Sequence, residues 1–134
     1  MKPLADTLIL IAEDERSVRM LLRVVLEAAG ARVLEAEDGH QALRLYELHP
    51  GIDALCTDVN MPNLDGVGLV AALREREPNL PIVACTALDL RGHASTLRAS
   101  VDGHVQKPFS PADVVRAIGD AIDVRRRSQR EAVS

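Results

Sequence analysis

The chain has 134 residues and a formal net charge of −4, and 47% of its residues are hydrophobic. This length is typical of one domain that buries a core, and the apolar content excludes a disordered chain. One tyrosine, one phenylalanine and a negative charge argue against binding of nucleic acid by this chain alone. No apolar run has the length of a membrane span and no signal peptide is recognisable, so we expect a cytoplasmic protein with reduced, buried Cys56 and Cys85.

Apolar runs and helical periodicity alternate along the chain. The runs predict five strands, at residues 7–12, 32–36, 52–57, 80–86 and 102–106. Periodicity, caps and breakers predict five helices, at residues 18–29, 38–50, 64–75, 89–100 and from 110 onwards. Asp38 is the expected cap of the second helix, and Ser110 followed by Pro111 is a strong start for the last.

The same periodicity predicts which side chains of each helix face the core. The inward residues of the first helix are expected to be Val18, Leu21, Leu22, Val25, Leu26 and Ala29. Those of the third are Val67, Val70, Ala71 and Leu73, and those of the last are Val114, Val115, Ile118, Ala121 and Ile122. Residues 89–100 have few apolar anchors, which favours a mobile segment.

Strands that alternate with helices predict a single α/β domain with a parallel sheet covered on both faces. In such sheets ligands bind outside the carboxyl ends of the strands. The polar residues at these ends are Glu13, Asp14, Asp58, Thr86 and Lys107. Oxygen ligands that supply only part of a coordination shell suit Mg²⁺, and a hydroxyl and an ammonium suit a phosphoryl group.

Each of these residues also has an ordinary structural interpretation. Asp58 can be a turn former, and Glu13 with Asp14 can be a charge pair at a helix start. Thr86 can simply end a strand, and Lys107 can be a solvated loop lysine. Their joint occurrence at successive strand ends favours a functional site.

With these motifs the chain resembles the receiver domains of response regulators in two-component signalling. The matching residues are Glu13-Asp14, Asp58, Met61-Pro62, Asp65-Gly66, Thr86-Ala87 and Lys107-Pro108-Phe109. The resemblance covers roughly residues 7–124 and implies a flavodoxin-like strand order of 2-1-3-4-5. We therefore assign residues 5–125 to a receiver domain and residues 126–134 to a basic C-terminal tail or the start of a linker.

The resemblance also implies roles for individual residues. Asp58 would accept a phosphoryl group from a histidine kinase or a histidine phosphotransfer protein. Asp14, Asp58 and the backbone carbonyl of Asn60 would bind Mg²⁺, with Glu13 assisting. Thr86 and Lys107 would contact the phosphoryl group, and the Lys107-Pro108 bond would be cis.

Activation would be read by a downstream protein or output domain at the face formed by residues from Asp89 to Ile122. His104 stands where the family usually has a tyrosine or phenylalanine that rotates inward with Thr86, so the switch would be weaker or sensitive to pH. Apolar Leu88 favours slow self-dephosphorylation. The chain would then be no enzyme beyond catalysing its own phosphorylation and slow dephosphorylation.

Two other functions use similar residues. A phosphohydrolase of the haloacid dehalogenase type also has an aspartate nucleophile, but it places a second aspartate where this chain has Asn60. A nucleotide-binding flavodoxin-like domain needs a glycine-rich loop after the first strand, where this chain has Glu13-Asp14-Glu15. A receiver remains the leading interpretation.

Overall fold

The structure is a computed structural model that describes residues 2–59, 61, 63–87 and 100–133. The strands in these residues are β1 (Leu8–Ala12), β2 (Arg32–Ala36), β3 (Ala54–Thr57), β4 (Ile82–Thr86) and β5 (Gly103–Gln106). The helices are α1 (Arg16–Ala28), α2 (Gly39–Leu48), α3 (Gly66–Arg76) and α5 (Pro111–Val133). The helix expected at residues 89–100 falls almost wholly outside the described residues.

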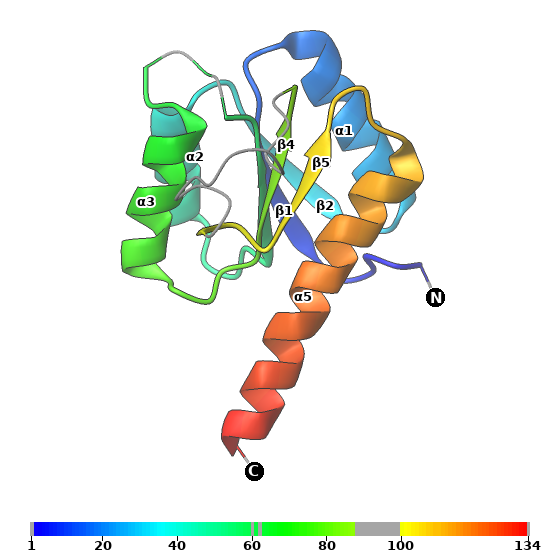
Figure 1. Cartoon of the computed structure of the whole chain (residues 1–134), viewed down its shortest axis with the longest axis vertical. Coiled ribbons are helices and arrows are strands. Elements are labelled where there is room, and N and C mark those ends of the chain that lie inside the picture. Colours follow the sequence, from blue (N-terminus) through cyan, green and yellow to red (C-terminus); the bar gives the residue numbers. More distant parts are fainter. Residues whose placement is uncertain (1, 60, 62, 88–99, 134) are drawn as a thin grey trace.

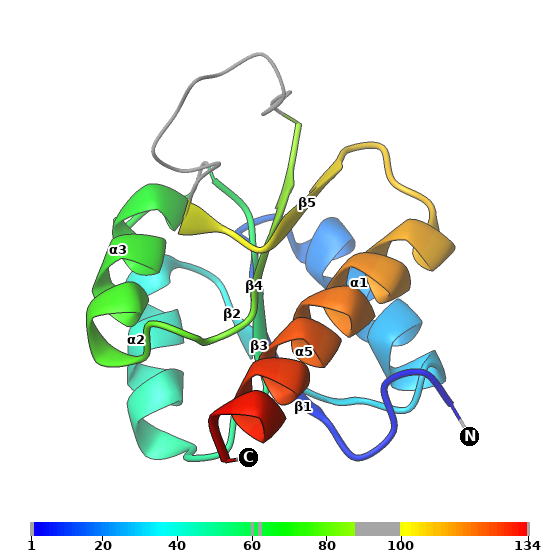
Figure 2. The same cartoon turned by 60° about the horizontal axis from the view of Figure 1, so that its bottom comes forward.

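The five strands form one parallel sheet in the order β2-β1-β3-β4-β5. This order confirms the expected flavodoxin-like arrangement. Helices α2 and α3 cover one face of the sheet and α1 and α5 cover the other (Figures 1 and 2). Chain order reverses at β1, so the ends of β1 and β3 lie at the position where such sheets bind ligands.

Alternate residues of the strands build two aliphatic cores. Ile9 and Ile11 of β1 face the core under α1 and α5, whereas Leu10 and Ala12 face the core under α2 and α3. The central strands β3 and β4 are buried along their whole length, as a sheet covered on both faces requires. Every residue in these cores that is fully buried and large is leucine or isoleucine, which agrees with the low aromatic content.

The expected helix caps are present. The side chain of Asp38 accepts a hydrogen bond from Gln41 N at 2.8 Å, and Ser110 Oγ accepts one from Asp113 N at 3.2 Å. Asp65 caps α3 by accepting from Gly68 N at 2.9 Å, although the sequence suggested only a turn there. These side chains satisfy N–H groups that have no partner inside the helix.

Some inward residues were predicted wrongly. Leu21 of α1 is 48% exposed, and Val67 and Ala71 of α3 are also exposed. The buried residues of α3 are instead Gly66, Leu69, Val70 and Leu73. The buried residues Leu69, Val70 and Leu73 pack in one core with residues of β1, β3 and β4, so contacts distant in sequence set which side of α3 faces the sheet.

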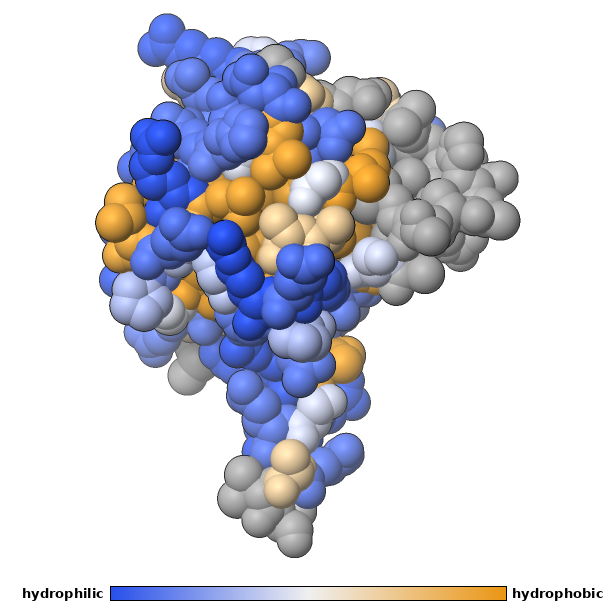
Figure 3. All heavy atoms as spheres, turned by 90° about the vertical axis from the view of Figure 1, so that its left-hand side faces the viewer, coloured by the Kyte–Doolittle hydropathy of each residue, from blue (hydrophilic) through white to orange (hydrophobic). Residues whose placement is uncertain are grey.

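Helix α5 continues well past its buried stripe. Residues 126–132 are exposed, and the helix projects from the body of the domain (Figure 1). Figure 3 shows this projection as mostly hydrophilic. The expected boundary between residues 125 and 126 therefore falls inside a continuous helix, at the point where it leaves the body.

Candidate functional site

The carboxyl ends of four strands bring the predicted polar residues to one edge of the sheet. Backbone hydrogen bonding continues one residue beyond the ends of β3 and β5. Asp58 N donates to Ala12 O of β1 at 2.9 Å, and Lys107 N donates to Thr86 O of β4 at 2.8 Å. Asp58 is thereby placed beside the residues that follow β1, and Lys107 beside the end of β4. The parallel sheet thus converts distant sequence positions into neighbours.

The ammonium group of Lys107 contacts two carboxylates at this edge, those of Glu13 and Asp58. Its Nζ lies 2.7 Å from Glu13 Oε1 and 3.1 Å from Asp58 Oδ2. Burial lowers the pKa of Lys107, but its hydrogen bonds to both carboxylates outweigh that effect and hold the pKa above its usual range. The lysine is therefore charged at neutral pH. The peptide bond between Lys107 and Pro108 is cis, as the resemblance implied.

Glu13 is the most deeply buried acid of the site, with 1% of its side chain exposed. Burial raises its pKa from the usual 4.5 to about 6, and hydrogen bonds from Lys107 and from the backbone of Glu15 limit the rise. Arg19 also donates to the backbone carbonyl of Glu13 at 2.8 Å. The position of this carboxylate is thus fixed by a lysine and by the start of α1.

Asp58 is held by hydrogen bonds at both of its carboxylate oxygens. Oδ1 accepts from Val59 N at 2.6 Å while Oδ2 accepts from Lys107. The following loop folds back on the strand, where Gly66 N donates to Val59 O at 2.9 Å. A Cβ at Gly66 would overlap the backbone of Asp58 and Val59, so the glycine permits this close approach.

Glu13, Asp14 and Asp58 form an acidic cluster. One oxygen from each carboxylate lies within 4.8 Å of the others, and Asp14 is exposed whereas the other two are buried. Three carboxylates this close repel one another, and one lysine offsets only part of that repulsion. Oxygen donors that leave part of a coordination shell open to solvent fit Mg²⁺ better than Zn²⁺ or Cu²⁺.

The remaining predicted residues are Thr86 at the end of β4, His104 within β5, and two residues outside the description. Thr86 is buried at the end of β4, in backbone contact with Lys107. His104 pairs in register with Ala84 and lines a depression between β5 and α5. Asn60 and Leu88 are outside the described residues. Sequence reasoning missed the hydrogen bond that Val59 N donates to Asp58. The turn signal of Asp65-Gly66 was the nearest indication of it, because Gly66 N donates to Val59 O and folds the loop back.

A comparison with protein families matches residues 9–119 to the response regulator receiver domain. Among curated relatives, a probable transcriptional regulator, ycf27, of Cyanophora paradoxa is 38% identical over 128 residues, which cover 94% of this chain and 51% of the relative. The alkaline phosphatase synthesis transcriptional regulatory protein PhoP of Bacillus subtilis is 36% identical over 107 residues, with 79% and 44% covered. The chain thus spans about half the length of these relatives.

Solved structures agree with this match. A response regulator receiver domain protein from Clostridium thermocellum superposes with a TM-score of 0.82 at 25% identity, covering 90% of this chain and 97% of the other. The chemotaxis protein CheY4 of Vibrio cholerae gives a TM-score of 0.76 at 27% identity, with 87% and 99% covered. Both similarities extend over nearly the whole described fold.

Proposed function

The chain belongs to the response regulator receiver domain family, and from that premise we propose that Asp58 is its phosphoacceptor, with Thr86 and Lys107 as the residues that sense the phosphoryl group. Receiver domains are signalling switches that take phosphoryl groups from histidine kinases, and this membership gives no support to the phosphohydrolase alternative. The observation that carries the assignment is the contact of Lys107 with both Glu13 and Asp58 at the strand ends.

In the proposed reaction, an oxygen of Asp58 attacks the phosphorus of a phosphohistidine. The new P–O bond forms as the P–N bond breaks, and the imidazole nitrogen keeps the electron pair and takes a proton. The hydrogen bonds from Val59 N and Lys107 hold the carboxylate in one orientation before attack. A partner histidine kinase or histidine phosphotransfer protein supplies the phosphoryl group.

The acidic cluster is the proposed place for Mg²⁺. Glu13, Asp14 and Asp58 would hold the ion, together with the backbone carbonyl of Asn60, which the structure does not describe. Bound there, Mg²⁺ would neutralise charge on the carboxylates and on the transferred group. Within the protein, Lys107 is the cation that balances Glu13 and Asp58.

The switch would follow from two new hydrogen bonds, from Thr86 and from Lys107 to the phosphoryl oxygens. Charge-assisted hydrogen bonds contribute about 1.5–3 kcal/mol each, so the two supply roughly 3–6 kcal/mol. Inverting a two-state equilibrium from 1:99 to 99:1 takes about 5.5 kcal/mol. The two contacts are therefore just sufficient, and incomplete activation is expected.

The proposal extends to domain limits and partners. Residues 5–125 form the receiver, and residues from 126 onwards begin a basic connection. A downstream protein or output domain would read the face that includes residues Asp89 to Ile122.

None of the helices in the described residues could span a membrane. We place the chain in the cytoplasm because Cys56 and Cys85 are free, buried thiols and receivers work with intracellular phosphoryl donors.

The test is covalent labelling with a small acyl-phosphate donor and Mg²⁺, followed by intact mass spectrometry. The expected product carries one phosphoryl group that hydroxylamine removes and that a chelator prevents. Asp58→Asn should abolish it. Asp6→Asn is the matched control, because Asp6 is exposed and has a φ of 61°, which asparagine tolerates equally well. Equal labelling of the parent and Asp58→Asn would refute the assignment.

A further inference from the structure

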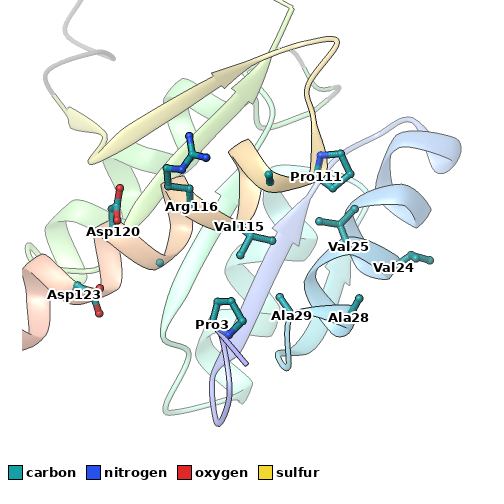
Figure 4. A pocket seen from close by; sticks show the side chains of 12 residues that line it. Pro3, Val24, Val25, Ala28, Ala29, Pro111, Val115, Arg116, Asp120 and Asp123 are labelled. Atoms are coloured by element: carbon teal, nitrogen blue, oxygen red, sulfur yellow. The ribbon is translucent and has the colours of Figure 1, made fainter. Parts of the chain in front are cut away.

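A groove lies between α1 and α5, on the side of the molecule away from α2 and α3. It has a volume of about 770 Å³, and Figure 4 shows Val25 of α1 on the side of that helix nearest Val115 of α5, with Val24 and Ala28 further along the α1 wall. Val24 is 63% exposed although it is apolar. Asp120 and Asp123 line the same groove from α5. The groove is therefore apolar along α1. Its α5 wall has Arg116 nearer the start of the helix and is acidic at Asp120 and Asp123, the lining residues nearest the projecting end.

The exposed side of α5 that lines the groove continues as a regular stripe of charges along the projecting part of the helix. Arg116, Asp120, Asp123, Arg127 and Arg130 are spaced by four, three, four and three residues, so they lie along one side of the helix. The acidic residues lie over the body, and the last two arginines lie on the projecting part. Among the described residues, no ion pair joins Asp120, Asp123, Arg127 or Arg130 to any other side chain.

This stripe is complementary to itself when reversed. If two such helices run antiparallel about a twofold axis near residue 125, Asp123 of one copy faces Arg127 of the other and Asp120 faces Arg130. Each contact then occurs twice. Val124, which is 52% exposed, meets its own copy near the axis. Arg126 also approaches its own copy, but its long side chain can reach Asp123 of the other.

We propose that two copies of this chain associate through α5, antiparallel, with the projecting end of each α5 lying along the α1–α5 groove of the other. The projection is basic, and the part of the α5 wall that it would contact carries Asp120 and Asp123, so charge complementarity selects this occupant. The bodies lie at opposite ends of the paired helices. Exposed ion pairs are individually weak, so we expect a dimer at high protein concentration that salt dissociates.

Sedimentation equilibrium of the whole chain tests the proposal. We expect a monomer–dimer equilibrium for the parent, and a dissociation constant at least about tenfold higher for Asp123→Arg and for Arg127→Glu, since each places like charges together twice. Glu75→Arg on α3 and Arg44→Glu on α2 are matched controls. They make the same charge changes at exposed helical positions away from α5, and should dimerise like the parent.

Mixing the two α5 variants gives the decisive result. At positions 123 and 127, Asp123→Arg has only positive charge and Arg127→Glu has only negative charge. Each variant alone should therefore stay monomeric, while the mixture forms a heterodimer. The double variant should form a homodimer again. Far-ultraviolet circular dichroism checks that every variant is folded. A parent that is monomeric at all concentrations, single variants that dimerise like the parent, or a mixture without heterodimer would each overturn the proposal.

Discussion

Lys107 donates a hydrogen bond to Glu13 across 94 residues of sequence, and at 2.7 Å this contact is shorter than the 3.1 Å contact of the same ammonium with Asp58. The lysine is thus as much a partner of a buried glutamate as of the proposed phosphoacceptor. Glu13 has almost no solvent to stabilise its charge. The stability of the fold and the chemistry of the site therefore depend on the same lysine.

Replacing Lys107 with methionine should destabilise the fold in the absence of divalent cations. Glu13 and Asp58 would lose their shared counter-charge, which costs about 3 kcal/mol for a broken buried pair. Part of the loss should return on addition of Mg²⁺, because the ion offsets the same carboxylates. Urea unfolding with chelator and with Mg²⁺ measures both effects. Lys2→Met, at an exposed residue, should change stability by less than about 0.5 kcal/mol.

Glu13 should make stability depend on pH when a chelator is present. Its pKa in the folded state is about 6 and its usual value is 4.5, so the folded state binds the proton more tightly. The stability gained from this proton is fully present below pH 4.5 and is lost as the pH rises through 6.

From below pH 4.5 to above pH 6, the free energy of unfolding of the parent should fall by about 2 kcal/mol relative to that of Glu13→Gln, in which residue 13 does not titrate. Urea unfolding of both proteins at a series of pH values gives the difference. A constant difference across the window would contradict the buried, titrating glutamate.

Thr86→Ala should separate phosphorylation from its consequence. The proposal gives Asp58 the bond to phosphorus and Thr86 only a hydrogen bond to the phosphoryl group, so labelling should remain close to that of the parent. The conformational response should weaken, because about 1.5–3 kcal/mol of its driving force is removed. Amide chemical shifts with and without the acyl-phosphate donor report the response.

Thr86→Ser provides the control, since it keeps the hydroxyl at a buried position. It should respond like the parent. If Thr86→Ala also responded fully, the switch would not depend on this hydroxyl.

Two glycines should respond oppositely to replacement by alanine. A Cβ at Gly66 would meet the backbone of Asp58 and Val59, which cannot easily move, so Gly66→Ala should cost about 1–3 kcal/mol and reduce labelling of Asp58. At Gly119, inside α5, the nearest atom is Leu4 Cδ2 at 3.9 Å. Gly119→Ala should therefore stabilise by up to about 1 kcal/mol through helix propensity. Thermal unfolding and the labelling assay measure both.

Local signals predicted the strands and helices because each depends on nearby residues. The cap residues Asp38 and Ser110 and the apolar runs were confirmed in the structure. The faces of α1 and α3 were less predictable. Leu21 and Val67 have the right spacing to be buried, but the direction in which each helix packs on the sheet is set by contacts distant in sequence.

The sequence by itself determined an alternating α/β fold and the set of polar residues at its strand ends, because strand and helix periodicity and breakers are local properties. The tertiary structure decided that Lys107 binds Glu13 as well as Asp58, that Val59 N holds the carboxylate, and that α5 continues away from the body. These depend on which strands pair and in which register. Parallel pairing between distant segments brings together groups whose spacing in the sequence says nothing about their distance in space.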